Sequence, residues 1–190
     1  GLAMHQAMYE NPAVVKNIEF LKNKVDFISP NFVEGKAKAA EPEEILSKIL
    51  QKFGSSRALK GKKVLITAGP TIEYIDPVRV ITNQSTGKTG VLLASEFVSA
   101  GSKVTMIYGP GIEIPPKGAK VIRVQTRNEM RDALRKELRQ KFDIVILAAA
   151  ASDYTLENPS KGKIHRDLLR MSLKLKRVPQ MIDDVKKIQS

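Results

Sequence analysis

The part of the sequence richest in groups that could bind a phosphate is residues 68–90. This segment follows an apolar run and is far longer than the two to six residues that usually join a strand to a helix, and such long loops are usually functional. It ends in Asn83-Gln84-Ser85-Thr86-Gly87-Lys88-Thr89-Gly90, where a helix is expected to begin. Two hydroxyls and the backbone amides at two glycines could bind an anion at the positive end of that helix. The pattern favours an anion or nucleotide site; the alternative is a well-capped helix preceded by a polar turn.

Two familiar phosphate-binding motifs are absent from this loop. Gly87-Lys88-Thr89 resembles the end of a P-loop, but that motif requires glycine five residues before Gly87, where Thr82 stands. There is also no Gly-x-Gly-x-x-Gly between the first strand and its helix, which argues against a nicotinamide-dependent oxidoreductase. The anion site that the loop favours is therefore neither a P-loop nor a dinucleotide-binding fingerprint.

Two further segments carry candidate ligand-binding groups. Residues 148–153 close an apolar strand with four alanines, Ser152 and Asp153, so a ligand could lie against the backbone while Asp153 binds a ribose hydroxyl or a metal-bound water. The alternative for residues 148–153 is that the alanines pack against a helix and Asp153 caps a turn. Residues 158–166 are basic, and Lys161, Lys163 and Arg166 could close over a triphosphate as a lid. The alternative is a solvated run of charge.

The elements that must position these segments alternate between strand and helix after about residue 60. Strands are expected at 63–68, 104–108, 121–124 and 143–151, and helices at 90–100 and 128–142. This alternation predicts an α/β fold with a doubly wound, mostly parallel sheet in a Rossmann-like, three-layer form. Ligands bind outside the carboxyl ends of the strands in such sheets, and three loops are expected there: residues 69–90, 109–116 and 152–165.

The first 60 residues have a different character and predict a small, mainly helical segment. Helices are expected at 12–22 and 42–53, a short buried strand at 26–30, a polar loop at 34–40 and a linker at 54–57. We therefore expect two domains, residues 1–60 and residues 61–190.

The composition argues against several classes of protein. A chain of 190 residues, 42% hydrophobic, supports one core and a smaller appendage, and no apolar run is long enough to span a membrane. Without cysteine there is no disulfide or thiolate chemistry, and His5 and His165 form no metal-binding spacing. The net charge of +12 is spread along the chain with few aromatic residues, so no nucleic-acid partner is expected. A cytoplasmic protein fits these features best.

Taken together, the segments after residue 60 resemble phosphopantothenoylcysteine synthetase. The matching motifs follow the family's order and spacing over roughly residues 61–190. They are Val64-Leu65-Ile66-Thr67-Ala68-Gly69-Pro70-Thr71-Ile72-Glu73, Ile75-Asp76-Pro77-Val78-Arg79, Ile81-Thr82-Asn83 with Ser85, Gly87, Lys88 and Gly90, Tyr108-Gly109-Pro110, Ala148-Ala149-Ala150 with Asp153-Tyr154, and residues 161–166.

The resemblance implies a phosphopantothenate–cysteine ligase of coenzyme A biosynthesis that uses Mg²⁺. The carboxylate of 4′-phosphopantothenate would attack the α-phosphate of CTP and expel pyrophosphate. Cysteine would then displace CMP from the acyl-cytidylate to form the amide. The protein would act by positioning and charge stabilisation. Two alternatives stay open: the same ligation with ATP, or a non-catalytic fragment that only binds nucleotide.

The resemblance also implies roles for individual residues. Asn83 is expected to hold the intermediate for attack by cysteine, and Lys163 matches a lid lysine for which Lys161 is the substitute. The implied nucleotide-binding residues are Gly69, Ser85, Gly87, Gly90, Ala148, Ala149, Asp153, Lys161, Lys163, Pro179, Gln180, Met181 and Ile182. The implied substrate-binding residues are Asn83, Ala148 and Asp153. No side chain is assigned to the metal. Arg79 is expected to be structural or to lie at a subunit contact, since family members form homodimers through this domain.

About the first 45 residues resemble, more weakly, the flavin-dependent phosphopantothenoylcysteine decarboxylase that many prokaryotes fuse to the synthetase. Residues 2–9 match a variant of its substrate motif in which His5 replaces asparagine and Tyr9 replaces tryptophan. Most of the flavin fold is missing, so we expect a remnant without decarboxylase activity, and FMN would belong to the missing part. The synthetase family continues beyond the stretch at 179–182 with further strands, so its sheet is expected to be C-terminally incomplete.

Overall fold

The computed structural model describes residues 4–22, 24–28, 30–33, 36–38, 40–53, 59–165 and 170–189. The chain divides into two compact units, residues 1–58 and residues 59–190. None of the helices in these described ranges combines the length and apolar composition needed to cross a bilayer.

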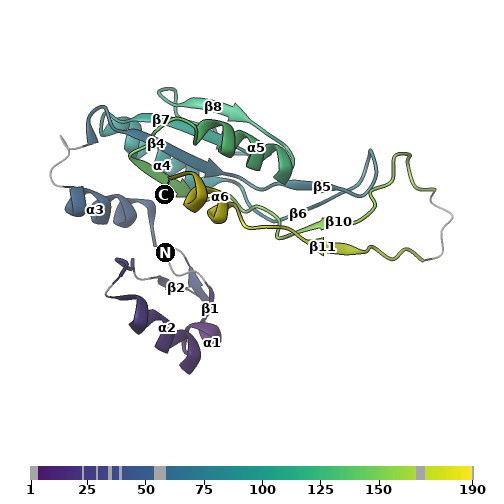
Figure 1. The fold of residues 1–190 in the computed structure, drawn as a ribbon, viewed down its shortest axis with the longest axis horizontal. Coiled ribbons are helices and arrows are strands. Elements are labelled where there is room, and N and C mark those ends of the chain that lie inside the picture. Colours follow the sequence, from purple (N-terminus) through teal and green to yellow (C-terminus); the bar gives the residue numbers. More distant parts are fainter. Residues whose placement is uncertain are drawn as a thin grey trace. The chain divides into compact units, whose positions relative to one another are not determined.

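A four-stranded parallel sheet forms the centre of the second unit (Figure 1). Its strands β4 (Lys63–Ala68), β7 (Lys103–Tyr108), β8 (Lys120–Arg123) and β9 (Ile144–Leu147) lie in the order β8-β7-β4-β9. In the two central strands, β4 and β7, every residue after the first is buried. Parallel strands that are covered on both faces have this continuous apolar character. The predicted parallel α/β sheet is thereby confirmed.

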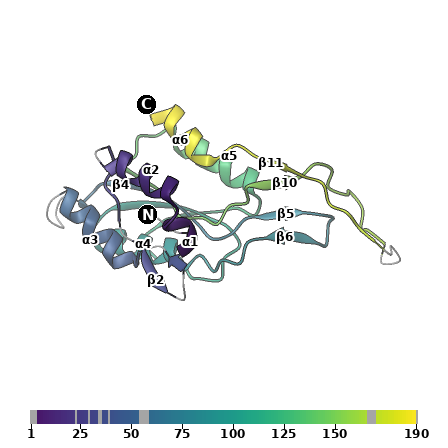
Figure 2. The ribbon, with the colours of Figure 1, turned by 90° about the horizontal axis from the view of Figure 1, so that it is seen from below.

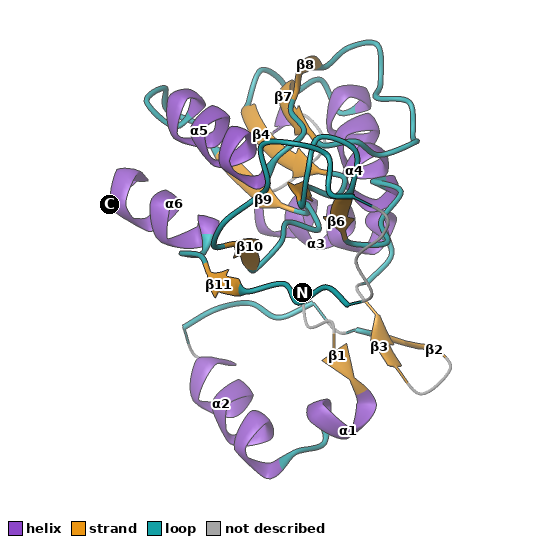
Figure 3. Ribbon diagram, turned by 90° about the vertical axis from the view of Figure 1, so that its right-hand side faces the viewer, coloured by secondary structure: helices purple, strands orange, loops and turns teal. Residues whose placement is uncertain are grey.

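Helices cover both faces of this sheet (Figure 3). Helix α4 (Lys88–Ser99) lies on one face, and α5 (Arg127–Glu137) and α6 (Met181–Gln189) lie on the other. A cluster of buried side chains joins the sheet to α5 and α6: Leu65, Ile107, Met130, Leu134, Leu138, Phe142 and Met181. Arg131 and Arg135 of α5 both bind the buried carboxylate of Asp184 in α6. The result is the expected three-layer arrangement.

Two antiparallel ribbons that the sequence did not reveal extend beyond the sheet (Figures 1 and 2). The first pairs β5 (Ile72–Tyr74) with β6 (Val80–Thr82) inside the long loop that follows β4. The second pairs β10 (Tyr154–Leu156) with β11 (Leu175–Arg177) and leads into α6. Each of these strands has three residues, too few for a recognisable alternation of apolar and polar side chains.

The predicted helix at 128–142 is too long. Helix α5 ends at Glu137, and the chain then turns, with the Gln140 amide donating to the Glu137 carbonyl at 2.9 Å. Leu138 and Phe142 remain buried in the core, so the apolar pattern continues beyond the helix itself. The Asp143 amide donates to the Lys63 carbonyl at 2.9 Å, which turns the chain into β9.

The predicted strand at 143–151 is also too long, because β9 ends at Leu147. Beyond it, the Ala148 amide donates to the Thr67 carbonyl at 3.1 Å, and the Ala150 amide to the Gly69 carbonyl at 2.9 Å. The alanines thus continue alongside the end of β4 outside the regular ladder. Their backbone is therefore held at the carboxyl edge of the sheet, where a ligand is expected.

The first unit contains a small sheet as well as the predicted helices. Its elements are β1 (Met4–His5), α1 (Gln6–Tyr9), α2 (Pro12–Lys22), β2 (Asn31–Val33), β3 (Lys36–Lys38) and α3 (Pro42–Phe53), with the strands in the order β1-β3-β2. The helices at 12–22 and 42–53 are confirmed. The strand expected at 26–30 is absent from its described residues, and β3 occupies part of the predicted loop at 34–40. A short apolar run does not identify a strand by itself. The predicted linker residues 54–57 lie outside the described residues.

Candidate active site

The start of α4 lies directly against the end of β4 because two positions are glycine. Gly87 is the N-cap residue, with a φ of 87° in the left-handed region. A Cβ at Gly90 would lie 2.3 Å from the Cβ of Ala68. With glycine at both positions, the helix begins close to the carboxyl edge of the sheet. Free amides in the first turn of such a helix suit an anion.

Tyr108 at the end of β7 packs against this loop and forms a hydrogen bond with it. Its hydroxyl lies 3.1 Å from the Thr86 carbonyl oxygen and 3.0 Å from that of Glu113. Burial raises the pKa of the Tyr108 phenol, which keeps the hydroxyl protonated as a donor. A Cβ at Gly87 would lie 2.6 Å from the ring, and a Cβ at Gly69 would lie 3.1 Å from it. Two of the predicted phosphate-binding glycines therefore pack on the same side chain.

The remaining predicted phosphate-binding residue, Ser85, belongs to the same loop. Its hydroxyl accepts a hydrogen bond from the Gly87 amide at 3.4 Å, and the Thr86 hydroxyl accepts one from the Lys88 amide at 3.2 Å. Both hydroxyls thus help to shape the turn before the helix. This agrees with the capping alternative and leaves the amides of the following residues for an anion.

A hollow of about 360 Å³ lies beyond the end of β9. Segments far apart in the sequence form it, and we call it the nucleotide hollow after the predicted nucleotide-binding residues that line it. Its lining residues are Thr67, Arg127, Leu147, Ala149, Ala151, Ser152, Asp153, Gln180, Met181 and Ile182. The structure therefore brings together five of the predicted nucleotide-binding residues: Ala149, Asp153, Gln180, Met181 and Ile182. Ala148 follows β9 directly, with its amide bound to the Thr67 carbonyl.

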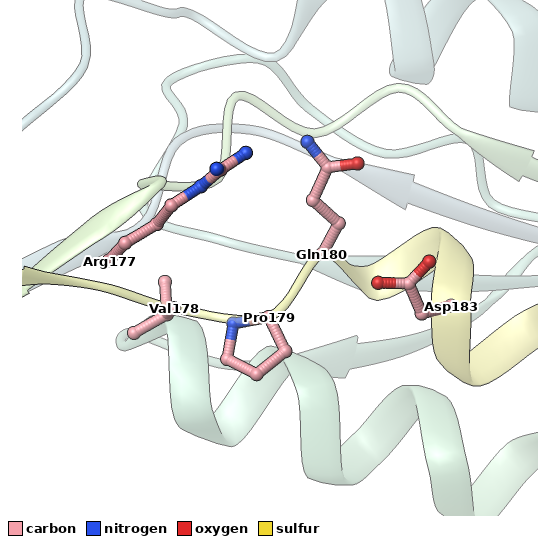
Figure 4. Close-up of a pocket in the computed structure, with 5 residues that line it drawn as sticks. All are labelled: Arg177, Val178, Pro179, Gln180 and Asp183. Atoms are coloured by element: carbon pink, nitrogen blue, oxygen red, sulfur yellow. The ribbon is translucent and has the colours of Figure 1, made fainter.

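The turn between β11 and α6 borders a second hollow of about 370 Å³ (Figure 4). Its lining residues are Arg177, Val178, Pro179, Gln180 and Asp183. Arg177 and Gln180 extend to the same side of the turn (Figure 4). Gln180 also lines the nucleotide hollow, and Pro179 offers its carbonyl to the guanidinium of Arg127. The predicted stretch at 179–182 thus borders both hollows.

Asn83 lies in a third hollow, of about 250 Å³, which we call the Asn83 hollow. It is lined by Glu73, Ile81, Asn83, Ser152, Asp153, Tyr154 and Leu175. The Asn83 side-chain nitrogen donates to the Ala150 carbonyl at 3.0 Å, which holds the side chain against the alanine segment that follows β9. Ser152 and Asp153 line both this hollow and the nucleotide hollow. The two hollows therefore share a wall.

Arg127 is a site residue that the sequence analysis missed. It is only 3% exposed, begins α5, and lines the nucleotide hollow. Burial lowers the pKa of its guanidinium, as does the nearby Arg131, while Glu73 and Asp153 raise it. The available signal was its position at the end of the short connection between β8 and α5, because that connection lies at the same edge of the sheet as the three loops that were considered.

The predicted lid segment is attached to the β5–β6 ribbon through Asp76. This carboxylate accepts hydrogen bonds from the amides of Val78 at 2.8 Å, Arg79 at 2.7 Å and Ile164 at 3.1 Å. The Arg79 guanidinium binds the same carboxylate and also the Ile164 carbonyl, at 3.2 Å. Arg79 therefore pairs with Asp76 and links the ribbon to the lid segment. Burial alone would raise the pKa of Asp76, but these hydrogen bonds outweigh it and lower the pKa to about 2.

The predicted lid lysines, Lys161 and Lys163, are exposed on either side of Gly162. Neither lines the three hollows described above. They precede the attachment point at Ile164, so their backbone is tethered while their side chains face solvent. Arg166 lies outside the described residues.

Within the described ranges, no group of three or more His, Asp or Glu side chains could hold a metal ion. Mg²⁺ generally keeps several waters and binds one or two carboxylates together with substrate phosphates. Asp153, in the wall shared by two hollows, is a carboxylate suited to that use. The site thus fits a magnesium ion that arrives on a nucleotide rather than a cage built by the protein.

Comparisons with known proteins identify the family. The chain belongs to the family described as DNA/pantothenate metabolism flavoprotein C-terminal domain, which matches residues 59–190. Residues 2–54 match the Flavoprotein family. This confirms the resemblance to the synthetase domain, preceded by a short flavoprotein fragment.

Similar proteins of known name agree with that membership. The coenzyme A biosynthesis bifunctional protein CoaBC of Thermococcus kodakarensis is 45% identical over 189 residues, covering 98% of this chain and 46% of that protein. The corresponding protein of Methanocaldococcus jannaschii is 41% identical over 188 residues, covering 98% and 45%. This chain spans a little under half the length of these two relatives. A crystal structure of the C-terminal domain of a CoaBC protein matches with a TM-score of 0.59 and 34% identity, covering 70% of this chain and 62% of that one.

Proposed function

We propose that this chain carries a phosphopantothenate–cysteine ligase site that activates 4′-phosphopantothenate with CTP. The observation that supports it is the shared wall between the nucleotide hollow and the Asn83 hollow, formed by Ser152 and Asp153. An acyl-nucleotide has a nucleotide part and an acyl part joined at one phosphate. Two adjoining hollows at the carboxyl edge of the sheet suit such a molecule.

In the first step, the chain binds and orients the nucleotide. The stretch at 179–182 contacts the base, Asp153 accepts a hydrogen bond from the ribose, and the glycine loop before α4 receives phosphate oxygens. Arg127 places a buried positive charge in the nucleotide hollow. The substrate carboxylate then attacks the α-phosphorus, the bond to the β-phosphate breaks, and pyrophosphate leaves. Mg²⁺ on the triphosphate supplies charge neutralisation when it is bound.

In the same step, Lys161 and Lys163 would neutralise the leaving pyrophosphate. Both lysines are exposed, and the tether at Ile164 holds their segment to the turn between β5 and β6, from which it would close over the triphosphate. Developing charge on a phosphate is stabilised most by cations that are already near it.

In the second step, Asn83 holds the acyl-cytidylate while the cysteine amine attacks its acyl carbon. The carbon–oxygen bond to CMP breaks as the amide forms. Asn83 suits this role because its side chain is already fixed by the Ala150 carbonyl, so little reordering is needed on binding.

Mass spectrometry of the acyl-nucleotide tests this proposal. The chain is mixed with 4′-phosphopantothenate and Mg²⁺, with CTP or ATP in parallel, and with or without cysteine. We expect an acyl-cytidylate that accumulates without cysteine, disappears when cysteine is added, and persists in Asn83→Ala. A stronger acyl-adenylate signal would show that ATP, not CTP, is the nucleotide that activates the substrate. Nucleotide binding without any adduct or pyrophosphate would contradict ligase activity.

We also propose that the second unit forms a homodimer through its ribbons. Large apolar side chains are exposed there: Tyr74, Val78, Val80, Tyr154 and Leu175 are between 39% and 65% exposed. Apolar groups gathered on projecting ribbons favour association with a second surface. Light scattering behind size-exclusion chromatography should give the mass of a dimer, and Val78→Asp should reduce it to that of a monomer. The cytoplasmic location stays a prediction.

A further inference from the structure

Glu73 in β5 has a carboxylate that is buried but only partly satisfied. The residue is 8% exposed, and its Oε2 accepts a hydrogen bond from the Thr155 hydroxyl at 2.5 Å. In the part of the chain that the structure describes, Oε1 is buried and has no hydrogen-bond partner. A buried charged oxygen without a donor carries a large desolvation penalty. Glu73 is also one of the residues that line the Asn83 hollow, so a ligand bound there is a nearby source of the missing donor.

The surroundings of Glu73 favour a positively charged ligand. The Asn83 hollow contains a second carboxylate, Asp153, and the phenol of Tyr154. Lys176 is the cross-strand neighbour of Thr155, but it is exposed. Arg127 lies near enough for Glu73 to raise its pKa, yet its guanidinium donates to the Pro179 carbonyl. The hollow thus presents two carboxylates in a chain whose net charge is +12.

We propose that the Asn83 hollow binds the amine nucleophile as its ammonium ion, and that Glu73 accepts the proton that makes this amine reactive. The inference rests on the proposed ligase function and adds a residue to it. The nucleophile must reach the acyl carbon beside Asn83, and Glu73 lines the same hollow as Asn83. A protonated amine has no lone pair, so a nearby acceptor must take a proton before attack.

The proton balance of the step is as follows. The ammonium group donates one proton to the Glu73 carboxylate, and the neutral amine forms a bond to the acyl carbon. The tetrahedral adduct collapses, the bond from this carbon to the nucleotide oxygen breaks, and the nitrogen gives a second proton to the departing nucleotide phosphate. The products are the amide, the nucleoside monophosphate and a protonated Glu73, which then releases its proton to water.

A single-turnover experiment on the chain separates the two steps. The acyl-nucleotide is first accumulated without cysteine, and its decay is then followed after cysteine is added. Glu73→Gln keeps the shape of the side chain but removes the proton acceptor. Glu157→Gln, at an exposed carboxylate next to β10, is the matched control. At neutral pH we expect Glu73→Gln to form the acyl-nucleotide at the wild-type rate and to slow its capture by cysteine by about 100-fold.

Two further readouts distinguish a proton acceptor from a structural residue. The loss in Glu73→Gln should shrink as the pH rises, because more of the free cysteine is then already deprotonated. Hydroxylamine is uncharged near neutral pH, so it should capture the acyl group at the same rate in Glu73→Gln and wild type. A Glu73→Asp variant should restore part of the capture by cysteine.

The outcomes separate this inference from the ligase proposal. If wild type forms the acyl-nucleotide but Glu73→Gln captures cysteine as fast as Glu157→Gln, the inference is wrong and the ligase proposal stands. The inference is equally wrong if Glu73→Gln loses capture of cysteine and hydroxylamine to the same extent at every pH, since Glu73 would then be structural. If wild type forms no acyl-nucleotide, both proposals fail.

Discussion

Glu73 and Asp76 lie three positions apart in the sequence, are both buried, and yet differ in how their charge is satisfied. Asp76 is 1% exposed and accepts hydrogen bonds from three backbone amides and from Arg79. Glu73 is 8% exposed, accepts one from Thr155, and has an oxygen with no partner among the described residues. Every donor around Asp76 comes from the protein, so its role is to fix the ribbon to the lid segment. The unpaired oxygen of Glu73 is the feature on which the proposed ammonium site rests.

The largest effect on stability should come from Asp76→Asn. The asparagine side chain has an NH2 group in place of one carboxylate oxygen, and this group cannot accept the hydrogen bonds that Asp76 accepts. Buried donors of Arg79 and Ile164 would then be left unpaired. We expect the melting temperature of the second unit to fall by several degrees. The matched control is Asp143→Asn, because Asp143 binds Lys62 and the Lys63 amide at the surface. Equal losses in the two variants would show that the burial of Asp76 does not matter.

The same carboxylate gives a pH test. The pKa of Asp76 is about 2 in the folded chain and about 3.9 when unfolded. A lowered folded pKa stabilises the fold above the unfolded value, and this contribution is lost as the pH falls from about 4 to about 2. Urea unfolding midpoints of wild type and Asp76→Asn should therefore converge over that interval. A gap that stays constant down to pH 2 would contradict this assignment. Asp184 and Asp143 also have lowered pKa values, but both are present in wild type and in Asp76→Asn, so they do not contribute to the difference between the two proteins.

A smaller effect is expected from Thr155→Val. This change removes the hydroxyl that donates to Glu73 and leaves the buried carboxylate without that donor. The free energy of unfolding should fall by about 1–3 kcal/mol, the usual cost of an unsatisfied buried acceptor. In a Glu73→Gln background the loss should be smaller, because the acceptor is no longer charged, and a double-mutant cycle measures this coupling. Purely additive losses would mean that the hydrogen bond is no stronger to the charged carboxylate than to the neutral amide.

The smallest effect on stability should come from Glu73→Gln. Removing a buried charge that is poorly paired relieves its desolvation penalty, and glutamine can still accept from Thr155. The melting temperature should stay close to that of wild type, in contrast to the loss in Asp76→Asn. A loss as large as that of Asp76→Asn would show that both carboxylates are structural and would remove the contrast between them.

The central sheet could be predicted because its strands carry their signal locally. The continuous apolar run of β4 gave its limits at Lys63 and Ala68 correctly, since a strand covered on both faces needs little information from elsewhere. The β5–β6 ribbon was missed because its strands are short and depend on distant partners. The amide of Ile72, for example, donates to the carbonyl of Gln125.

The candidate site was predicted unevenly for the same reason. Asn83 and Asp153 were named from motifs, and the structure places them in one hollow. Glu73 was named within a motif but received no role, since its hydrogen-bond partner Thr155 lies in a strand that was not predicted. Arg127 was missed because a single arginine at a helix start has no distinctive pattern. Its importance appears only when the stretch at 179–182 packs beside it.

The most direct test of the proposed ligase is the fate of a heavy-oxygen label in the carboxylate of 4′-phosphopantothenate. The account predicts that attack on the α-phosphorus transfers one labelled oxygen to the nucleoside monophosphate, while the other remains in the amide. Mass spectrometry of the released CMP, or of AMP in a parallel reaction with ATP, would show that single label. Unlabelled monophosphate, or label found in inorganic phosphate, would contradict an acyl-nucleotide intermediate and with it the roles proposed for both hollows.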